Sequence, residues 1–119
     1  MKTTAIIGAS PNPERYAYMA TSRLKKYGYP VFPIGIHEGK IEGENILTDK
    51  PQLKDIHTVT LYVGPQNQVH WIDYILSLKP KRIIFNPGTE NPEFEKKATE
   101  NGIECLEACT LVLLSIDQY

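Results

Sequence analysis

Short apolar runs alternate along this chain with segments whose apolar residues recur at helical spacing. Five of these runs are rich in β-branched or aromatic residues and end at glycine, proline or asparagine, which is typical of buried strands. The predicted strands comprise residues 3–7, 30–34, 58–63, 82–85 and 103–106. Because the runs show no polar face, we expect the sheet to be covered on both sides.

Helical periodicity separates the predicted strands. Asn12 and Asn91 are each followed by proline, a pairing typical of a helix N-cap and first helical position. Glycine or proline ends each periodic segment. The predicted helices comprise residues 13–27, 69–79 and 91–101, with a single helical turn at 51–56. Residues 37–48 predict a long loop, and residues 110–116 predict a short terminal helix, although periodicity leaves a strand open there.

Alternating strands and helices favour a parallel sheet, because right-handed crossovers leave few other connections. We expect an α/β fold in which residues 1–119 form one domain with a doubly wound, mainly parallel five-stranded sheet and helices on both faces. Such sheets bind ligands beyond the carboxyl ends of their strands, where the strand order reverses. The segments predicted to meet there are 8–16, 35–40, 64–67, 86–89 and 108–110.

The first strand passes through Gly8 into a predicted helix start. Backbone N–H groups and the positive end of a helix dipole converge at such a turn and favour an anion. Ser10 adds a hydroxyl, and Arg15 is a cation placed at the unfavourable end of the dipole, at a cost of roughly 0.3–1 kcal/mol that an anion would relieve. The full dinucleotide motif has two further glycines, where this chain has Ser10 and Pro13. Phosphate binding and simple chain reversal both remain open for this turn.

Composition narrows the classes of partner. Thirteen basic and fourteen acidic residues nearly cancel, which argues against binding to nucleic acid or an anionic membrane. No apolar run approaches the roughly 18 residues of a membrane span and no leader pattern is present, so we expect a cytoplasmic protein. Cys105 and Cys109 match neither a redox pair nor a zinc motif, and we expect reduced thiols. His37, His57 and His70 show no metal-ligand spacing, so no metal site is predicted.

Several segments taken together resemble a known family. They are residues 7–15 (IGASPNPER), residues 27–34 (YGYPVFPI), the pair Gly43-Glu44 and the triplet Asn86-Pro87-Gly88. The chain resembles small bacterial CoA-binding-domain proteins, which are related to the CoA-binding domain of the succinyl-CoA synthetase α subunit. This resemblance extends over essentially the whole chain, and it implies a Rossmann-like sheet with CoA or an acyl-CoA as ligand.

The resemblance also implies a set of binding residues. In that domain the diphosphate of CoA rests on the first glycine turn and the nucleotide lies across neighbouring strand ends. By matching position, the phosphate side takes Gly8, Ala9, Ser10, Asn12 and Arg15, and the adenosine side takes Pro33, Val63 and Pro65. The predicted cofactor-binding set is completed at the ends of the last two strands by Asn86, Gly88 and Cys109.

This chain departs from the family pattern at three places. The family often has Pro-Val-Asn-Pro after the second strand, where residues 33–36 lack the asparagine, and an Arg-Pro pair where this chain has Gly64-Pro65. The cysteine in the last loop of the family matches Cys109, but the basic residue commonly near it is missing from residues 109–112. The Cys109 thiol is therefore either an inert, buried group or a partner for a mixed disulfide with the pantetheine thiol.

The sequence is compatible with three functions. The first is a module that binds CoA or acyl-CoA and carries no catalytic residues of its own, with an unidentified protein partner. The second is an NAD(P)-dependent enzyme or subunit completed by a partner, in which Glu38 would bind ribose, although it lies about thirty residues after Gly8 instead of the usual twenty. The third is an interaction domain whose nucleotide crevice stays empty.

Overall fold

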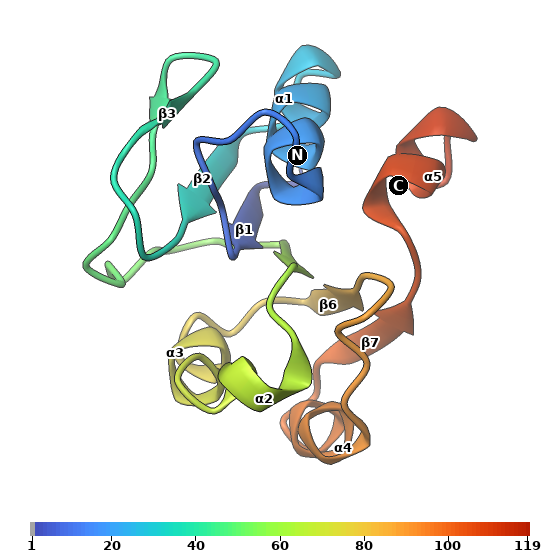
Figure 1. The fold of residues 1–119 in the computed structure, drawn as a ribbon. Helices are drawn as coiled ribbons and strands as arrows, with labels where there is room; N and C mark the ends of the chain where they lie inside the picture. Colours follow the sequence, from blue (N-terminus) through green and yellow to red (C-terminus); the bar gives the residue numbers. More distant parts are fainter. Residues whose placement is uncertain (1) are drawn as a thin grey trace.

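The computed structural model describes residues 2–119 and contains a main sheet of five parallel strands (Figure 1). Their order across the sheet is β2-β1-β5-β6-β7, so the order reverses beside β1. The strands are β1 (Thr4–Ile7), β2 (Val31–Ile34), β5 (Thr58–Leu61), β6 (Arg82–Phe85) and β7 (Glu104–Glu107). Each predicted strand is confirmed, with its ends displaced by two residues at most.

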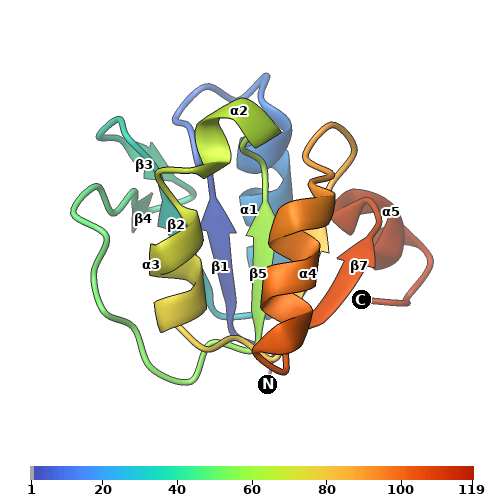
Figure 2. The same ribbon diagram turned by 90° about the horizontal axis from the view of Figure 1, so that it is seen from below.

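Helices cover both faces of the sheet (Figure 2). Helices α1 (Tyr16–Lys26) and α5 (Thr110–Ser115) pack together on one face. The opposite face carries α2 (Pro65–Gln68), α3 (Ile72–Ser77) and α4 (Pro92–Glu100). The doubly wound α/β fold is therefore confirmed, and residues 110–116 form a helix instead of a strand.

The first helix begins later than its sequence suggests. Asn12 does not cap it: its side chain accepts the N–H of Glu14 at 3.0 Å and closes a local turn, and Arg15 is the N-cap residue. Pro13 disfavours helical geometry at Asn12, because a residue before proline avoids the α region. A turn therefore precedes the helix along the chain. The prediction of a helix start at Pro13 was wrong by one turn.

Three other local predictions need correction. Residues 37–48 are not a plain loop, because they contain a hairpin of β3 (Lys40–Ile41) and β4 (Glu44–Asn45). Residues 51–56 form no helical turn. The predicted helix 69–79 is shorter and starts at Ile72, since Val69 and His70 form a turn between α2 and α3.

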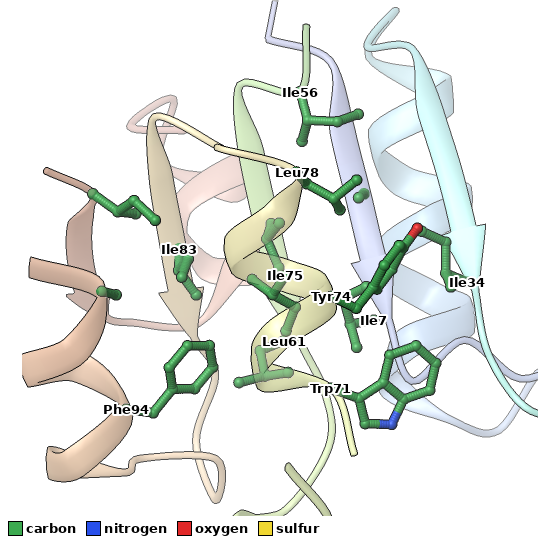
Figure 3. Packing of buried hydrophobic residues seen from close by; sticks show 14 of the residues in the cluster. Ile7, Ile34, Ile56, Leu61, Trp71, Tyr74, Ile75, Leu78, Ile83 and Phe94 are labelled. Atoms are coloured by element: carbon green, nitrogen blue, oxygen red, sulfur yellow. The ribbon is translucent and has the colours of Figure 1, made fainter. Parts of the chain in front are cut away.

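Alternate strand residues supply the two cores. On the α2–α4 side, Ile7, Leu61 and Ile83 pack against the short helices, as Figure 3 shows. The other side, beneath α1 and α5, is smaller and includes Ile6 and Ile84. Because helices cover both faces of the sheet, a ligand can reach the sheet only at the ends of its strands. Within residues 2–119 no helix has the length and apolarity needed to cross a membrane.

Candidate functional site

A crevice of about 780 Å³ lies where the strand order reverses, beyond the carboxyl ends of β1, β5 and β6. Its volume is within the usual range for small-molecule sites. It is lined by Gly8, Ala9, Ser10, Arg15, Tyr16, Ala17, Gly35, Ile36, His37, Lys50, Tyr62, Val63, Gly64, Asn67, His70, Trp71, Pro87, Gly88 and Thr89. The position is the one that parallel α/β sheets use for ligands.

The glycine turn after β1 is held tightly by its neighbours. The N–H groups of Gly8 and Ala9 both donate to the carbonyl of Ile34 at 2.9 Å, so neither is free for a phosphate. Gly8 has a φ of 96°, and a side chain there would meet Val63 and Tyr62 at 3.0–3.1 Å. Gly8 therefore shapes the turn by its backbone conformation and small size.

The unused donors of this turn lie further along the chain. Within residues 2–119 the N–H groups of Ser10, Tyr16 and Ala17 donate no hydrogen bond, and no side chain caps α1. The Ser10 hydroxyl accepts from the N–H of Asn12 at 3.1 Å and keeps its own hydrogen for a ligand. An anion at this end of α1 would meet free N–H groups and the positive end of the helix dipole.

A second glycine brings β2 close to the turn. A side chain on Gly35 would lie 2.3 Å from the carbonyl oxygen of Ala9, a separation that backbone atoms cannot accommodate. The close approach of the two strand ends therefore leaves no room for a side chain at Gly35.

The lining of the crevice carries positive charge without a compensating carboxylate. This charge belongs to Arg15, at the start of α1, and to Lys50, on the segment before β5. His37 and His70 add imidazole groups from two further loops. No aspartate or glutamate belongs to the lining within residues 2–119. The whole chain has a net charge of −1, so this positive charge is a local feature of the crevice.

Two buried or half-buried aromatic side chains, Tyr62 and Trp71, line the crevice. Burial raises the pKa of Tyr62 far above its usual value, and the nearby Thr60 and Thr110 hydroxyls only partly offset that effect. Tyr62 is therefore a neutral phenol at every physiological pH. Trp71 is buried, and the ammonium group of Lys50 lies 4.7 Å from the centre of its ring.

The structure brings together six of the eleven residues predicted to bind the cofactor. Gly8, Ala9, Ser10, Arg15, Val63 and Gly88 all line the crevice. The remaining five lie outside its lining: Asn12, Pro33, Pro65, Asn86 and Cys109. Their roles as ligand contacts stay predictions.

Physical reasons account for the places of these five. Pro33 is buried within β2, Asn12 is exposed in its own turn, and Pro65 is an exposed first residue of α2. Cys109 is the half-buried N-cap residue of α5. Asn86 is buried directly before Pro87, which lines the crevice.

Asn86 acts within the frame of the site. Its amide nitrogen donates to the Thr60 hydroxyl at 2.7 Å and to the carbonyl of Leu61 at 2.9 Å. Its amide oxygen accepts the N–H of Thr110 at 2.9 Å. Asn86 therefore ties β5 and β6 to the start of α5 and leaves no amide hydrogen free for a ligand.

Gln68 is a second frame residue, and the sequence offered no signal for it. Its fully buried side chain donates to the carbonyls of Val63 at 2.8 Å and Thr89 at 2.7 Å. Its amide oxygen accepts from Asn91 at 2.8 Å. These bonds join α2 to the loop after β5 and to the loop after β6 at the edge of the crevice. In the sequence, the polar stretch around Gln68 indicates only a turn.

Four other lining residues carry no signal in the sequence: Lys50, Trp71, His37 and His70. The scattered positions of the two histidines favour solvated surface residues, whereas the structure places both in the lining. Within residues 2–119, no group of three or more His, Cys, Asp or Glu side chains is placed to bind a metal.

Comparisons with known proteins bear on the family and on the fold of the chain. The sequence profile of a family described as CoA binding domain matches residues 2–115. A search of curated proteins gave no match.

Several solved structures are similar to the whole chain. A crystal structure of an uncharacterized protein is 51% identical, with a TM-score of 0.98, over 100% of this chain and 98% of that one. A protein from Thermus thermophilus is 26% identical, with a TM-score of 0.85, over 99% of this chain and 90% of that one. A dinucleotide-forming acetyl-coenzyme A synthetase from Candidatus Korarchaeum cryptofilum shares the fold at 19% identity and a TM-score of 0.72, over 90% of this chain and 25% of that one.

Proposed function

This chain belongs to the CoA binding domain family, and on that premise we propose that residues 1–119 form one module that holds CoA or an acyl-CoA in the crevice. In this proposal the diphosphate lies at the Gly8–Ser10 turn and the start of α1. The module supplies binding and no catalytic machinery of its own.

One observation carries the proposal: a crevice of ligand size at the reversal of strand order is positively charged and contains no carboxylate. CoA brings a diphosphate and a further phosphate, and these groups complement such a lining. The free N–H groups at the start of α1 and the Arg15 guanidinium are suited to the diphosphate. Gly8 and Ala9 contribute shape only, because their N–H groups already bind Ile34.

The same lining supports binding over chemistry. General acid–base catalysis commonly pairs a histidine with a carboxylate that orients it, and His37 and His70 have no carboxylate in the described lining. Tyr62 remains protonated, because burial raises its pKa. Cys109 lies outside the lining, so a mixed disulfide with bound CoA requires the pantetheine arm to extend beyond the crevice.

Calorimetric and thermal-shift titrations with CoA, acetyl-CoA, NAD and NADP, all with reductant present, test the proposal. We expect one-to-one binding of CoA or acetyl-CoA and a higher melting temperature, since a ligand at 100 times its Kd stabilises the folded state by about 2.7 kcal/mol. Binding of NAD alone would support the nicotinamide alternative, and silence from all four ligands would leave the interaction domain.

A pair of variants locates the site. Ser10→Trp fills the turn at the start of α1 and should abolish CoA binding while the protein stays folded. Ser115→Trp is the matched control, because Ser115 is an exposed residue of α5 outside the crevice lining. Equal CoA affinity in the two variants would place the ligand elsewhere.

A further inference from the structure

The two sides of the crevice correspond to two parts of a nucleotide. In doubly wound sheets the diphosphate lies at the first strand-to-helix turn, and the ribose lies near the end of the neighbouring second strand. Here the first turn leads to Arg15 and α1, and the second strand, β2, leads through Gly35 to His37. The β2 side is therefore the ribose side of this crevice.

A further segment joins the ribose side. Leu47 pairs with Ile34 alongside β2, with the N–H of Leu47 donating to Pro33 at 2.9 Å and its carbonyl accepting from Gly35 at 3.0 Å. The chain then continues along the edge of the crevice and places Lys50 in its lining. Lys50 thus reaches the ribose side through the pairing of residue 47, far from any nucleotide motif in the sequence.

The charge on this side differs from that of an NAD site. A ribose with free hydroxyl groups is commonly bound by an acidic residue after the second strand, whereas a phosphorylated ribose is met by a basic one. This crevice has Lys50 and His37 on its ribose side, and Glu38 is exposed and outside the lining. The charge pattern therefore matches a ribose that carries a phosphate.

Lys50 is held in place before any ligand arrives. Its backbone is left-handed, with a φ of 48°, and its ammonium group donates to the carbonyl of His70. The same ammonium lies over the ring of Trp71, which packs in the core beside Tyr74 with ring centres 6.2 Å apart (Figure 3). Lys50 forms no salt bridge within residues 2–119, and an ammonium has three donors, so hydrogen atoms remain for a phosphate.

We propose that the crevice selects nucleotides whose ribose carries a phosphate, and that Lys50 is the specificity-determining residue that binds this phosphate. The inference rests on the proposed function, in which the ligand is CoA with its 3′-phosphate. The 2′-phosphate of NADP has the same chemistry, and the test includes both. Neither dephospho-CoA nor NAD carries this group.

The test measures the affinities of CoA, dephospho-CoA, NADP and NAD by calorimetry at one salt concentration. The unmodified protein should bind CoA at least tenfold more tightly than dephospho-CoA, since the 3′-phosphate adds a hydrogen bond between charged groups. Lys50→Met should reduce this ratio to about one and change dephospho-CoA affinity less than twofold. Lys50→Arg should retain most of the preference, because it retains the charge.

Lys54→Met is the matched control: Lys54 lies four positions later on the same segment but lines a hollow at the opposite end of the sheet. It should leave the preference unchanged. Dephospho-CoA binding also reports whether each variant remains folded.

The outcomes separate this inference from the proposed function. Equal affinity of the unmodified protein for CoA and dephospho-CoA, or an equal loss of both in Lys50→Met, overturns the role of Lys50 and leaves a CoA module intact. A preference for NADP over NAD that Lys50→Met removes, without CoA binding, supports the phosphorylated ribose and overturns the CoA module. Binding of none of the four overturns both.

Discussion

The two ends of the parallel sheet both carry a basic hollow, and they differ in what surrounds the charge. The crevice at the carboxyl end contains Arg15 and Lys50. The amino-end hollow, of about 650 Å³, lies before β5 and β6 and contains Lys54, Lys79 and Lys81 together with a carboxylate, Asp55. Volume and the presence of cations therefore do not distinguish the two ends.

Helix direction distinguishes them. The amino-end hollow lies beside the end of α3, where Lys79 follows the last turn and complements the negative end of the helix dipole. At the carboxyl end, Arg15 stands at the positive end of the α1 dipole, beside N–H groups without partners. Lys79 is thus placed favourably relative to its helix dipole, whereas Arg15 opposes the dipole of α1. A cation that opposes its helix dipole indicates a ligand more strongly than a cation alone.

The largest effect should come from closing the gap between the two strand ends that form the crevice. Gly35→Ala brings a methyl group within 2.3 Å of the Ala9 oxygen, so β2 must separate from the turn after β1. We expect a loss of about 1–3 kcal/mol in the free energy of unfolding and loss of CoA binding. Denaturant titration and calorimetry measure the two effects.

Gly64→Ala is the control for that substitution. A methyl group at Gly64 meets only the movable side chain of Gln66, at 3.2 Å, although Gly64 also lines the crevice. It should cost less than about 1 kcal/mol. Similar losses in the two variants would show that glycine flexibility, and not close approach, matters at both positions.

A substitution at Arg15 should raise the stability of the fold and weaken CoA binding. Arg15 occupies the N-cap position with an extended backbone and no capping side chain, and aspartate is a preferred residue there. Arg15→Asp should therefore stabilise the fold by about 0.5–2 kcal/mol. It should weaken CoA binding at least tenfold, because a carboxylate replaces the cation beside the diphosphate.

The opposite end of the same helix provides the contrast. Lys26 lies in the last turn of α1, where its charge complements the dipole, and it does not line the crevice. Lys26→Asp should destabilise the fold by about 0.3–1 kcal/mol and leave CoA affinity unchanged. If Arg15→Asp instead lowered the melting temperature, Arg15 would be part of the structural frame and its opposition to the dipole would have no functional meaning.

The sequence predicts the sheet well because its strands are uninterrupted apolar runs. It predicts the start of α1 poorly because Asn12-Pro13 fits both a helix cap and a local turn. In the structure the Asn12 side chain accepts the N–H of Glu14 and closes the turn. Residue preferences alone do not distinguish this turn from a helix cap.

The site is only partly visible in the sequence for a similar reason. Gly8, Ser10 and Arg15 follow a strand directly, so their place in the crevice can be predicted from local order. Lys50 and Trp71 arrive there through tertiary contacts: the pairing of residue 47 with β2 and the packing of α3 on the sheet. No periodicity or motif in the segments that contain Lys50 and Trp71 predicts those tertiary contacts.

The smallest effect should appear at the amino-end hollow as a dependence of stability on pH. Burial lowers the pKa of His57, and the charges of Arg82, Lys2 and Lys81 lower it further. A histidine whose pKa is lower in the folded state resists protonation there, so its contribution to stability is complete above the unfolded value of about 6.5 and is lost as the pH falls through the folded value.

Melting temperatures at pH 7.5 and pH 5.5 test this interpretation. The unmodified protein should lose more stability between these pH values than His57→Gln, whose amide does not titrate. Lys81→Gln should reduce the loss partially, since it removes one of the cations that oppose protonation. CoA affinity at pH 7.5 should be the same in all three proteins, because charge in the amino-end hollow acts on the fold and charge in the crevice acts on the ligand. A weaker CoA affinity in Lys81→Gln would contradict this separation of the two ends.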